Sequence, residues 1–374
     1  MSFPTALRPS PFQARVPESL SPDDFIDVNG MAVPLFMSDP AAEYEAFRTT
    51  AGMIDFSMLF KWEVTGPDAI AVLNSVFSRD VRKIAAGRIA YGVIVDERGM
   101  MLDDCTILVY GPDRVRVTGG NPRVGELLAD ALPHGHDLVE LRDDIATLSL
   151  QGPRSREILQ SISTHDLSNE AFPYYTFQTD VPVAGIPAHI NRMGFTAELG
   201  YEVMVPVDRA LELWDAIEAA GAPFGVRACA AAALMVVRVE AGMIMAELEY
   251  DHETSPYECR MGWAVDLEKP AFHGSQALAA RKQTARRTVG SIVIDAPPEG
   301  LDGAALLVDG ENVGTVTMAV SSPALGGRTL ALARLNKGYS AAGQRLEVST
   351  VHAPCTAEVV ATPVYDPERS RVRS

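Results

Sequence analysis

The sequence predicts an α+β fold with two related α+β (ferredoxin-like) subdomains and a C-terminal domain of short strands. Two observations predict it. The order strand, helix, strand, strand, helix over residues 61–132 recurs at looser spacing from residue 145. After about residue 285 the chain changes to short strands separated by Gly, Pro and Asn turns, which is typical of a small barrel or sandwich. At 374 residues the chain is also too long for one simple core.

The first subdomain follows a proline-rich arm, residues 1–45, which we expect to lie on the surface. Residues 40–55 repeat apolar side chains at helical spacing and predict a helix, with Gly52 just past its end. Alternation and turn residues then predict strands at 61–66, within 88–111 on both sides of the ERG turn, and at 115–120, with helices at 67–78 and 121–132.

The second subdomain repeats this order. It has a predicted strand at 145–152, a helix at 153–162, strands around 188–193 and 201–207, a helix at 210–221 and a third helical stretch at 227–242. We therefore expect a catalytic region over 46–284 and a barrel domain over 285–374, with the boundary in the basic stretch 278–288.

Charge and cysteine usage exclude several classes of protein. The net charge of −17 and pI near 4.8 would repel nucleic acid and anionic membranes, so we expect neither as a partner. The N-terminus has no signal-peptide core and no run of 18 apolar residues occurs, which predicts a cytoplasmic protein. The four cysteines show no CxxC spacing and His134 and His136 fit a solvated turn, so no metal site is expected.

Two adjacent carboxylates, Asp103 and Asp104, stand between an apolar turn and an apolar strand in GMMLDDCTILVY. Side chains alternate across a strand, so the two should point to opposite faces. One of them should then face the interior, where a carboxylate costs several kcal/mol unless a partner compensates it. An isolated DD pair more often only closes a turn.

Several stretches together resemble the aminomethyltransferase family, which comprises the glycine-cleavage T-protein and its tetrahydrofolate-dependent methyltransferase and demethylase relatives. They fall in family order and include AGMIDFS (51–57), RGMMLDD (98–104), LSLQGP (148–153), MGFTAELGYEV (193–203), RVEAG (238–242), SPYECRMGWAV (255–265) and GTVTMAVSSP (314–323). The resemblance implies three domains in a ring around a central folate site, which agrees with two α+β units and a terminal β-barrel. It also implies that Asp104 is the catalytic member of the DD pair. A carboxylate there would stabilise the charge that develops at N5 of tetrahydrofolate and accept its proton, a contribution often worth ~3 kcal/mol.

The resemblance assigns folate contacts to further residues, each with an alternative. Tyr91 could instead be a half-buried strand tyrosine, Glu202 a strand-edge charge, and Thr118 and Asn121 parts of a simple turn. Phe195 stands where the family motif has tyrosine, which keeps the stacking face without the hydroxyl.

Departures from the family pattern bear on the reaction. The histidine of the family's DVSHM is absent, with Leu59 near the place of its methionine, and Leu234 replaces an arginine of the T-protein. Ala197 and Leu199 replace Gly and Asp. The T-protein accepts its one-carbon unit from an acidic carrier protein, and docking of that carrier to this acidic chain would be opposed. The resemblance therefore favours a demethylase that moves a methyl group from a small O-, N- or S-methylated compound to tetrahydrofolate.

The residues around the donor are predicted from two aromatic and acidic stretches. These candidates are Leu59, Phe60 and Trp62, and Tyr250, Asp251 and His252 in EYDHETSPYE, which is equally explained as a solvated loop. Lys269 is expected at the surface rather than against the glutamate tail of folate. Two other functions stay open. One is the T-protein reaction. The other is that of a non-catalytic folate-binding branch of the family, whose motif contains a reactive cysteine; the corresponding region of this chain has Cys259 but not the rest of that motif. The N-terminal arm could support a homo-oligomer, and the identity of the donor is not fixed by the sequence.

Overall fold

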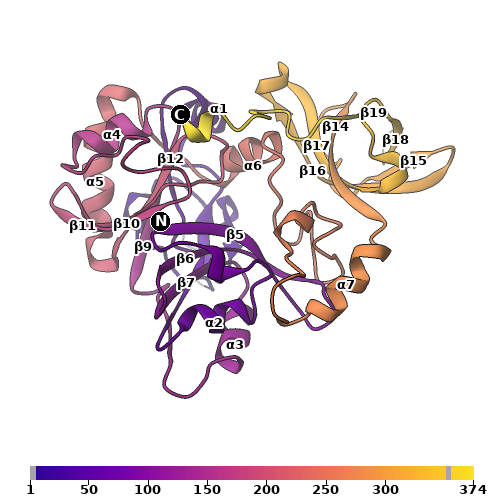
Figure 1. Cartoon of the computed structure of the whole chain (residues 1–374). Helices are drawn as coiled ribbons and strands as arrows, with labels where there is room; N and C mark the ends of the chain where they lie inside the picture. The colour runs from indigo at the N-terminus through magenta and orange to yellow at the C-terminus, as the bar shows by residue number, and fades with distance from the viewer. Residues whose placement is uncertain (1–5, 351–354) are drawn as a thin grey trace.

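The computed structural model describes residues 6–350 and 355–374. It contains two α+β units, which lie together, and a closed β-barrel beside them (Figure 1). The predicted α+β fold with a C-terminal barrel is confirmed.

The first unit is a five-stranded antiparallel sheet with the strand order β5-β6-β7-β4-β8. Two helices cover one face, because Val72 and Val124 pack with Val64 and Ile107 into one core. The elements are β4 (Phe60–Thr65), α2 (Ala69–Asn74), β5 (Arg88–Val95), β6 (Met101–Gly111), β7 (Arg114–Gly119), α3 (Arg123–Asp130) and β8 (Asp137–Glu140).

The second unit repeats this arrangement, with the order β10-β11-β12-β9 followed by β3 and β13. Its core, which includes Leu148, Val203 and Trp214, lies under α4 and α5. The elements are β9 (Ile145–Gln151), α4 (Ser155–Ser161), β10 (Phe177–Val183), β11 (Ile186–Asn191), β12 (Gly200–Pro206), α5 (Ala210–Gly221) and β13 (Arg227–Ala228). The two units are therefore related, as the recurrent order of elements predicts.

The helix predicted to end before Gly52 is confirmed as α1 (Pro40–Thr49), whereas the residues after it form a strand that was not predicted. This strand, β3 (Gly52–Asp55), pairs with β9 and β13 of the second sheet. At Gly52 an added Cβ would lie 2.5 Å from the Phe47 ring and 2.7 Å from Cys229 Sγ, so the chain turns back tightly against α1. Burial on both faces gives this strand a continuous apolar run, which hides the two-residue period.

The helix α6 (Ala231–Glu240) connects the units to the barrel through buried ion pairs. Arg48 of α1 donates to Glu240 at 2.7 Å, and Glu240 also accepts from Ser322 of the barrel at 2.7 Å. Arg238 pairs with Glu249 at 2.6 Å with both side chains fully buried. The RVEAG motif is thus explained by its role in joining the domains.

The barrel closes in the order β14-β17-β16-β15-β18-β19, which resolves the choice between barrel and sandwich. Alternate residues such as Ile292, Leu306 and Val348 fill its interior. The helix α7 (Ser275–Thr284) precedes it. The strands are β14 (Arg287–Ile294), β15 (Ala305–Val308), β16 (Glu311–Ser322), β17 (Arg328–Asn336), β18 (Arg345–Ser349) and β19 (Cys355–Val360).

Both ends of the described chain pack on the α+β units. Near the N-terminus, β1 (Phe25–Val28) and β2 (Met31–Pro34) form a hairpin. Residues 361–374, here called the C-terminal strap, run from the barrel back to the second unit, where the chain ends (yellow in Figure 1). No helix within the described residues is long and apolar enough to span a membrane.

Candidate active site

A cavity of about 1490 Å³ opens between the two units, the segment after α6 and the C-terminal strap. It is larger than the ~300–1,000 Å³ typical of small-ligand pockets, so it has room for more than one ligand. Its lining includes Tyr91, Asp103, Asp104, Thr118, Phe195, Glu202, Leu234, Met245, Tyr250 and Tyr365.

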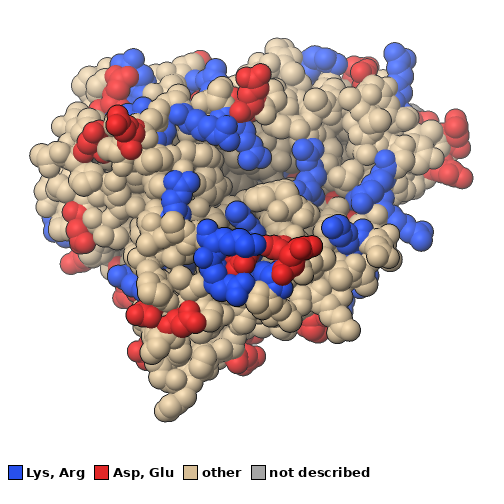
Figure 2. Space-filling model, in the orientation of Figure 1, with Lys and Arg blue, Asp and Glu red and all other residues tan. Residues whose placement is uncertain are grey.

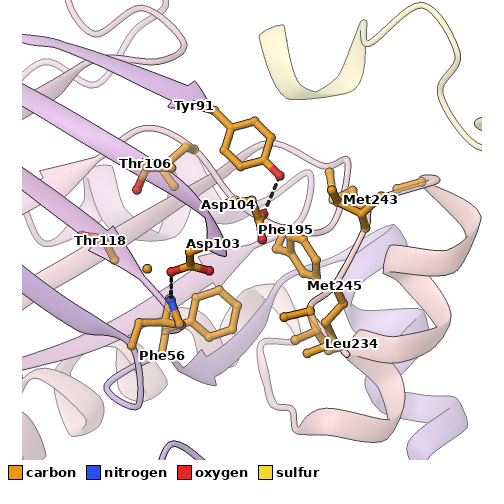
Figure 3. Close-up of a pocket in the computed structure, with 18 of the residues that line it drawn as sticks. Phe56, Tyr91, Asp103, Asp104, Thr106, Thr118, Phe195, Leu234, Met243 and Met245 are labelled. Carbon is orange, nitrogen blue, oxygen red and sulfur yellow. Dashed lines mark hydrogen bonds between the residues drawn. The ribbon is translucent and has the colours of Figure 1, made fainter. Parts of the chain in front are cut away.

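Asp104 projects from β6 into this cavity (Figure 3). The Tyr91 hydroxyl donates to its Oδ2 at 2.5 Å, and the Tyr250 hydroxyl donates to its Oδ1. Within the described residues no lysine, arginine or histidine forms an ion pair with Asp104. Two neutral hydroxyls therefore hold the Asp104 carboxylate in place without neutralising its negative charge, which remains able to interact with a ligand.

Asp103 also lines the cavity, and its Oδ1 lies 3.4 Å from the Tyr250 oxygen that binds Asp104, so the two carboxylates meet at the cavity and are not kept apart on opposite faces of the sheet as alternation predicts. It is 2% exposed, and its Oδ2 accepts the main-chain N–H groups of Gly120 at 2.7 Å and Asn121 at 3.0 Å. A Cβ on Gly119 would lie 2.3 Å from Asp103 Oδ2, so a glycine is needed beside it. The more deeply buried carboxylate is thus Asp103, not Asp104 as expected, and backbone amides stabilise it.

A β-bulge sets the position of the pair. Ile94 faces Asp103 and Val95 faces Met101, which leaves Leu102 as the additional residue in β6. Bulges redirect side chains and are common beside active sites.

Burial raises the pKa of both carboxyl groups. For Asp103, burial and the charge of Asp104 raise the pKa to about 7. For Asp104, burial raises the pKa, and the hydroxyls of Tyr250 and Tyr91 oppose this rise by hydrogen bonding to the charged form. A carboxylate with a raised pKa is better suited to accept a proton than one with an ordinary pKa.

Apolar side chains form the wall that faces Asp104. Phe195, Leu234, Met243 and Met245 lie together on this side, with Phe56 below Asp103 (Figure 3). Leu234, where the resemblance implies an arginine in the T-protein, contributes an apolar side chain to this wall. The wall therefore suits a compact apolar or methylated group.

Glu202 of β12 is a polar residue that the second unit contributes to the cavity wall. It is 7% exposed, accepts from Asn191 at 3.3 Å, and burial raises its pKa to about 7. Behind it lies Lys61, 1% exposed, which donates to the Leu59 carbonyl at 3.0 Å. Burial lowers the pKa of Lys61 to about 8, while the charges of Asp55 and Glu202 oppose this shift.

The loop that carries Phe195 is held by Gln151 of the LQGP motif. The Gln151 amide donates to the Met193 carbonyl at 3.1 Å and accepts from Thr196 at 3.1 Å. Ala197 has a left-handed backbone conformation, with φ of +60°. A non-glycine residue in that conformation costs roughly 1 kcal/mol, so the loop is strained at this position.

Most residues that the sequence nominates meet in this one cavity. Those that line it are Leu59, Tyr91, Asp104, Thr118, Asn121, Phe195, Glu202, Tyr250 and His252. The Asn121 amide donates to the Leu102 carbonyl, and His252 is exposed at the opening, where its carbonyl accepts from Arg98. Tyr250, nominated for the donor side, is bound to Asp104 itself.

Trp62 and Phe60 do not reach the cavity, so their nomination as substrate-side residues is corrected. Their rings stack 5.2 Å apart in the core of the first unit, where Trp62 is 4% exposed. Alternation along β4 places residues 60, 62 and 64 under the helices and Lys61 on the opposite face.

Two further nominations are also corrected. Lys269 is neither at the surface nor in the cavity lining, because its Nζ donates to the carbonyls of Asn74, Phe77 and Arg79 at 2.6–3.0 Å. Asp251 pairs with Arg334 at 2.5 Å, and its pKa falls to about 2 because hydrogen bonds, the first from Arg334, outweigh burial. Asp251 does line the cavity, but its negative charge is already paired with Arg334.

The arginines of the cavity were not found from the sequence. They lie far apart along the chain and follow no motif; the set is Arg79, Arg88, Arg192, Arg260, Arg369 and Arg373. Figure 2 shows Lys and Arg side chains around the hollow in this face of an otherwise acidic molecule. Only the return of the C-terminal strap to the second unit brings its arginines there.

Comparison with known proteins identifies two family matches that together span most of the chain. Residues 23–269 match the GCVT N-terminal domain. Residues 286–366 match the glycine cleavage T-protein C-terminal barrel domain.

Individual relatives agree with these matches. An aminomethyltransferase of Geobacillus sp. is 33% identical over 355 residues, which cover 91% of this chain and 94% of that protein. A trimethylamine-oxide aldolase of Ruegeria pomeroyi is 32% identical over 370 residues, covering 94% of this chain but only 46% of that protein. The chain thus spans about half the length of that relative.

A solved structure shares the fold. The glycine cleavage system aminomethyltransferase T from Bartonella henselae superposes with a TM-score of 0.84 at 23% identity, covering 96% of this chain and 98% of that one. This similarity extends over both α+β units and the barrel.

Proposed function

Because this chain belongs to the family of the glycine cleavage T-protein, whose members transfer one-carbon units with tetrahydrofolate, we propose that it is a tetrahydrofolate-dependent methyltransferase (demethylase). It would move a methyl group from a small O-, N- or S-methylated compound to N5 of tetrahydrofolate. The observation that supports this most is Asp104, a carboxylate held by two tyrosine hydroxyls in a largely apolar cavity.

The residues of the cavity fit a reduced pterin. Glu202 presents a buried carboxylate that accepts one side-chain hydrogen bond among the described residues, from Asn191, and so retains acceptor capacity for ring N–H groups. The Thr118 hydroxyl is buried at the cavity wall and has no partner within the described residues. Phe195 offers an aromatic surface between them and α6.

Asp104 has two tasks in this proposal. Tetrahydrofolate, when bound, supplies N5 as the nucleophile. In this proposal the negative charge of Asp104 would stabilise the positive charge that develops at N5, and the carboxylate would accept the N5 proton. The Tyr91 and Tyr250 hydroxyls hold the carboxylate in place, and the backbone N–H of Asp104 donates to the Tyr250 oxygen at 3.2 Å.

The donor side of the cavity supports a small methylated substrate. Leu234, Met243 and Met245 provide apolar contact close to Asp104 and no ionic partner. A relative named trimethylamine-oxide aldolase acts, by its name, on an N-methylated compound, which favours this substrate class. A cationic donor that leaves as a neutral molecule would need no acid beside the leaving group.

The aminomethyl transfer of the T-protein is the second candidate. It is supported by the aminomethyltransferases that align with nearly the whole chain. The non-catalytic branch has less support, because the thiol it would use is inaccessible: Cys259 is 0% exposed and burial raises its pKa far above the usual range.

A donor panel tests the proposal. Purified protein is incubated with tetrahydrofolate and methoxybenzoates, betaines, sulfonium compounds or N-methyl amino acids, and 5-methyltetrahydrofolate is measured by mass spectrometry. Donor-dependent product that is absent with Asp104→Asn supports the proposal. Methylenetetrahydrofolate formed only with an aminomethyl-lipoyl carrier protein would instead establish the T-protein reaction.

A further inference from the structure

Glu202 is the last member of a series of hydrogen-bonded side chains. The Tyr110 oxygen lies 3.3 Å from His189 Nδ1, and His189 Nε2 lies 2.9 Å from Asn191 Oδ1. The Asn191 amide nitrogen in turn donates to Glu202 Oε2 at 3.3 Å. Tyr110 belongs to β6 of the first unit, whereas His189 and Asn191 belong to β11 of the second. Of these four residues only Glu202 lines the cavity, so the other three support it from behind.

Aromatic contacts hold the His189 ring in one orientation. It stacks on the Phe177 ring, with the two centroids 5.2 Å apart and the two planes 8° from parallel. The Tyr110 ring packs against the same Phe177 ring at 4.6 Å between centroids. Beyond His189, the Asn191 side chain is 1% exposed. The imidazole nitrogens are thus fixed relative to a buried amide.

The hydrogen bonds of this series run in one direction while Glu202 is ionised. A carboxylate only accepts, so the Asn191 NH2 group faces it and the Asn191 oxygen faces His189. His189 Nε2 therefore carries a proton. The ring is otherwise neutral, because burial lowers its pKa to about 3 and the charge of Arg116 acts in the same direction. His189 Nδ1 is then the acceptor for the Tyr110 hydroxyl.

His189 selects between two orientations of the Asn191 side chain. The oxygen and NH2 ends of an amide have nearly the same size, so packing alone does not distinguish them. In the reversed orientation the Asn191 oxygen would face Glu202 Oε2, and the NH2 group would face the proton on His189 Nε2. Glu202 would then lose the side-chain hydrogen bond that it accepts from Asn191. The Nε2–H group of His189 therefore sets which end of the amide reaches the carboxylate.

The series leaves Glu202 able to accept further hydrogen bonds. The two oxygens of a carboxylate offer about four lone-pair positions, and Asn191 takes one of them. Lys61 of β4 also acts on this group: its positive charge and the Asn191 hydrogen bond both oppose the rise in the pKa of Glu202 that burial causes. Glu202 is thus held from behind by an amide, and its remaining acceptor positions are available at the cavity wall.

We propose that His189 is a positioning residue for pterin binding: it fixes the Asn191 amide, which in turn orients Glu202 toward the ring N–H groups of a reduced pterin. This inference rests on the proposed function, which assigns the pterin to Glu202. His189 and Asn191 do not touch the ligand. They act through Glu202, because a binding carboxylate keeps its geometry only when the side chains behind it hold it in place.

Binding of an unreactive folate tests this role without a methyl donor. Isothermal titration calorimetry with 5-formyltetrahydrofolate compares the wild type with His189→Phe, which keeps a ring against Phe177 and removes both nitrogens. We expect the affinity to fall about tenfold, the effect of losing one hydrogen bond to a charged group. His189→Gln can again present an N–H group to the Asn191 oxygen and should recover most of the affinity. Lost packing alone would not be recovered by glutamine, which has no ring.

A double-mutant cycle shows whether His189 acts through Asn191. Asn191→Ala should weaken binding on its own. His189→Phe added to it should cause no further loss, because the group through which His189 acts is gone. His165→Phe is the matched control, since His165 is exposed, belongs to the second unit and is outside the cavity lining. Its affinity should equal that of the wild type.

A measurement on the wild-type protein covers the case in which His189→Phe does not fold. Long-range ¹H–¹⁵N NMR spectra distinguish the two neutral tautomers of histidine, and the His189 signals are those missing in His189→Gln. We expect a neutral ring with its proton on Nε2 near pH 7. A proton on Nδ1 would require the Asn191 amide to point the other way and would overturn the inference.

The remaining outcomes separate this inference from the proposed function. Unchanged affinity in His189→Phe, or a full further loss when it is added to Asn191→Ala, would overturn the inference. The proposed function would stand in that case as long as Glu202→Gln still weakens binding. Unchanged affinity in Glu202→Gln would overturn the assignment of the pterin to Glu202 and, with it, the inference. Absence of folate binding by the wild type would overturn both the inference and the proposed function.

Discussion

The Tyr250 hydroxyl is hydrogen-bonded twice to Asp104: it donates to Oδ1 of the carboxylate and accepts from the Asp104 backbone N–H at 3.2 Å. The same oxygen lies 3.4 Å from Oδ1 of Asp103. One phenol therefore links both carboxylates of the pair to the segment after α6. Its position fixes the orientation of Asp104 and favours the charged form of that carboxylate.

Tyr250→Phe should shift the pH dependence of turnover. The lost hydrogen bond favours ionised Asp104, so its removal raises the pKa of Asp104, and less of the active carboxylate is present at low pH. We expect the acidic limb of the kcat profile to move upward by roughly one to two pH units, since such bonds contribute about 1.5–3 kcal/mol and one pH unit corresponds to about 1.4 kcal/mol.

Tyr257→Phe is the matched control, because the buried Tyr257 hydroxyl has no partner within the described residues. Its profile should coincide with that of the wild type. An unchanged profile in Tyr250→Phe would mean that the hydroxyl does not act on the reacting carboxylate.

Asp104→Asn should reduce kcat by about 100-fold or more, since electrostatic groups of this kind commonly contribute that much. The amide oxygen can still accept from one of the two tyrosine hydroxyls and the amide NH2 group can donate to the oxygen of the other, so the fold and the affinity for 5-formyltetrahydrofolate should persist. Stopped-time assays by mass spectrometry give the rate, and calorimetry gives the affinity. Turnover close to that of the wild type would exclude Asp104 as the catalytic group.

Glu202→Gln should stabilise the protein more at pH 8 than at pH 5. Burial raises the pKa of Glu202 from 4.5 to about 7, so the folded state binds this proton more tightly than the unfolded state does. The wild type therefore loses stability as the pH rises from about 4.5 to 7, by roughly 3 kcal/mol at about 1.4 kcal/mol per pH unit.

Urea unfolding of both proteins at the two pH values measures this difference. Glutamine at position 202 does not ionise, so the free energy of unfolding of the variant, relative to that of the wild type, should increase with pH. A constant difference would show that Glu202 is ionised in the folded protein throughout.

Lys269→Met should lower stability by about 3 kcal/mol or more, because three buried carbonyls lose their donor. Folate affinity should not change, since Lys269 is outside the cavity lining. Thermal unfolding and calorimetry separate the two effects, and Lys282→Met, an exposed lysine of α7, is the control. If Lys269→Met weakened folate binding without lowering stability, Lys269 would have to be a folate-binding residue.

The sequence predicted the features that depend on local pattern. The strand and helix order of both units and the position of Glu202 in a strand follow from residue spacing. Strand alternation alone predicted that Asp103 and Asp104 would be kept apart, but both line the cavity. The barrel could be inferred only as a barrel or sandwich, because strand closure is a property of long-range pairing.

Features that depend on long-range contacts were missed or wrongly placed. Trp62 seemed suited to a ligand site by its residue type, but alternation along β4 places it under α3, where Gly125 makes room for it. Lys61 and Lys269 are ordinary surface residues by composition, and only tertiary packing buries them. The arginines at the opening come together solely because the C-terminal strap returns to the second unit.

The most direct test of methyl transfer follows a donor whose methyl group carries three deuterium atoms. Once the panel identifies a donor, its labelled form is mixed with tetrahydrofolate and the folate product is analysed by mass spectrometry. Transfer of an intact methyl group predicts 5-methyltetrahydrofolate with all three deuterium atoms. A methylene product with two deuterium atoms would show that the carbon arrives at the oxidation level of formaldehyde, and it would contradict the proposed reaction.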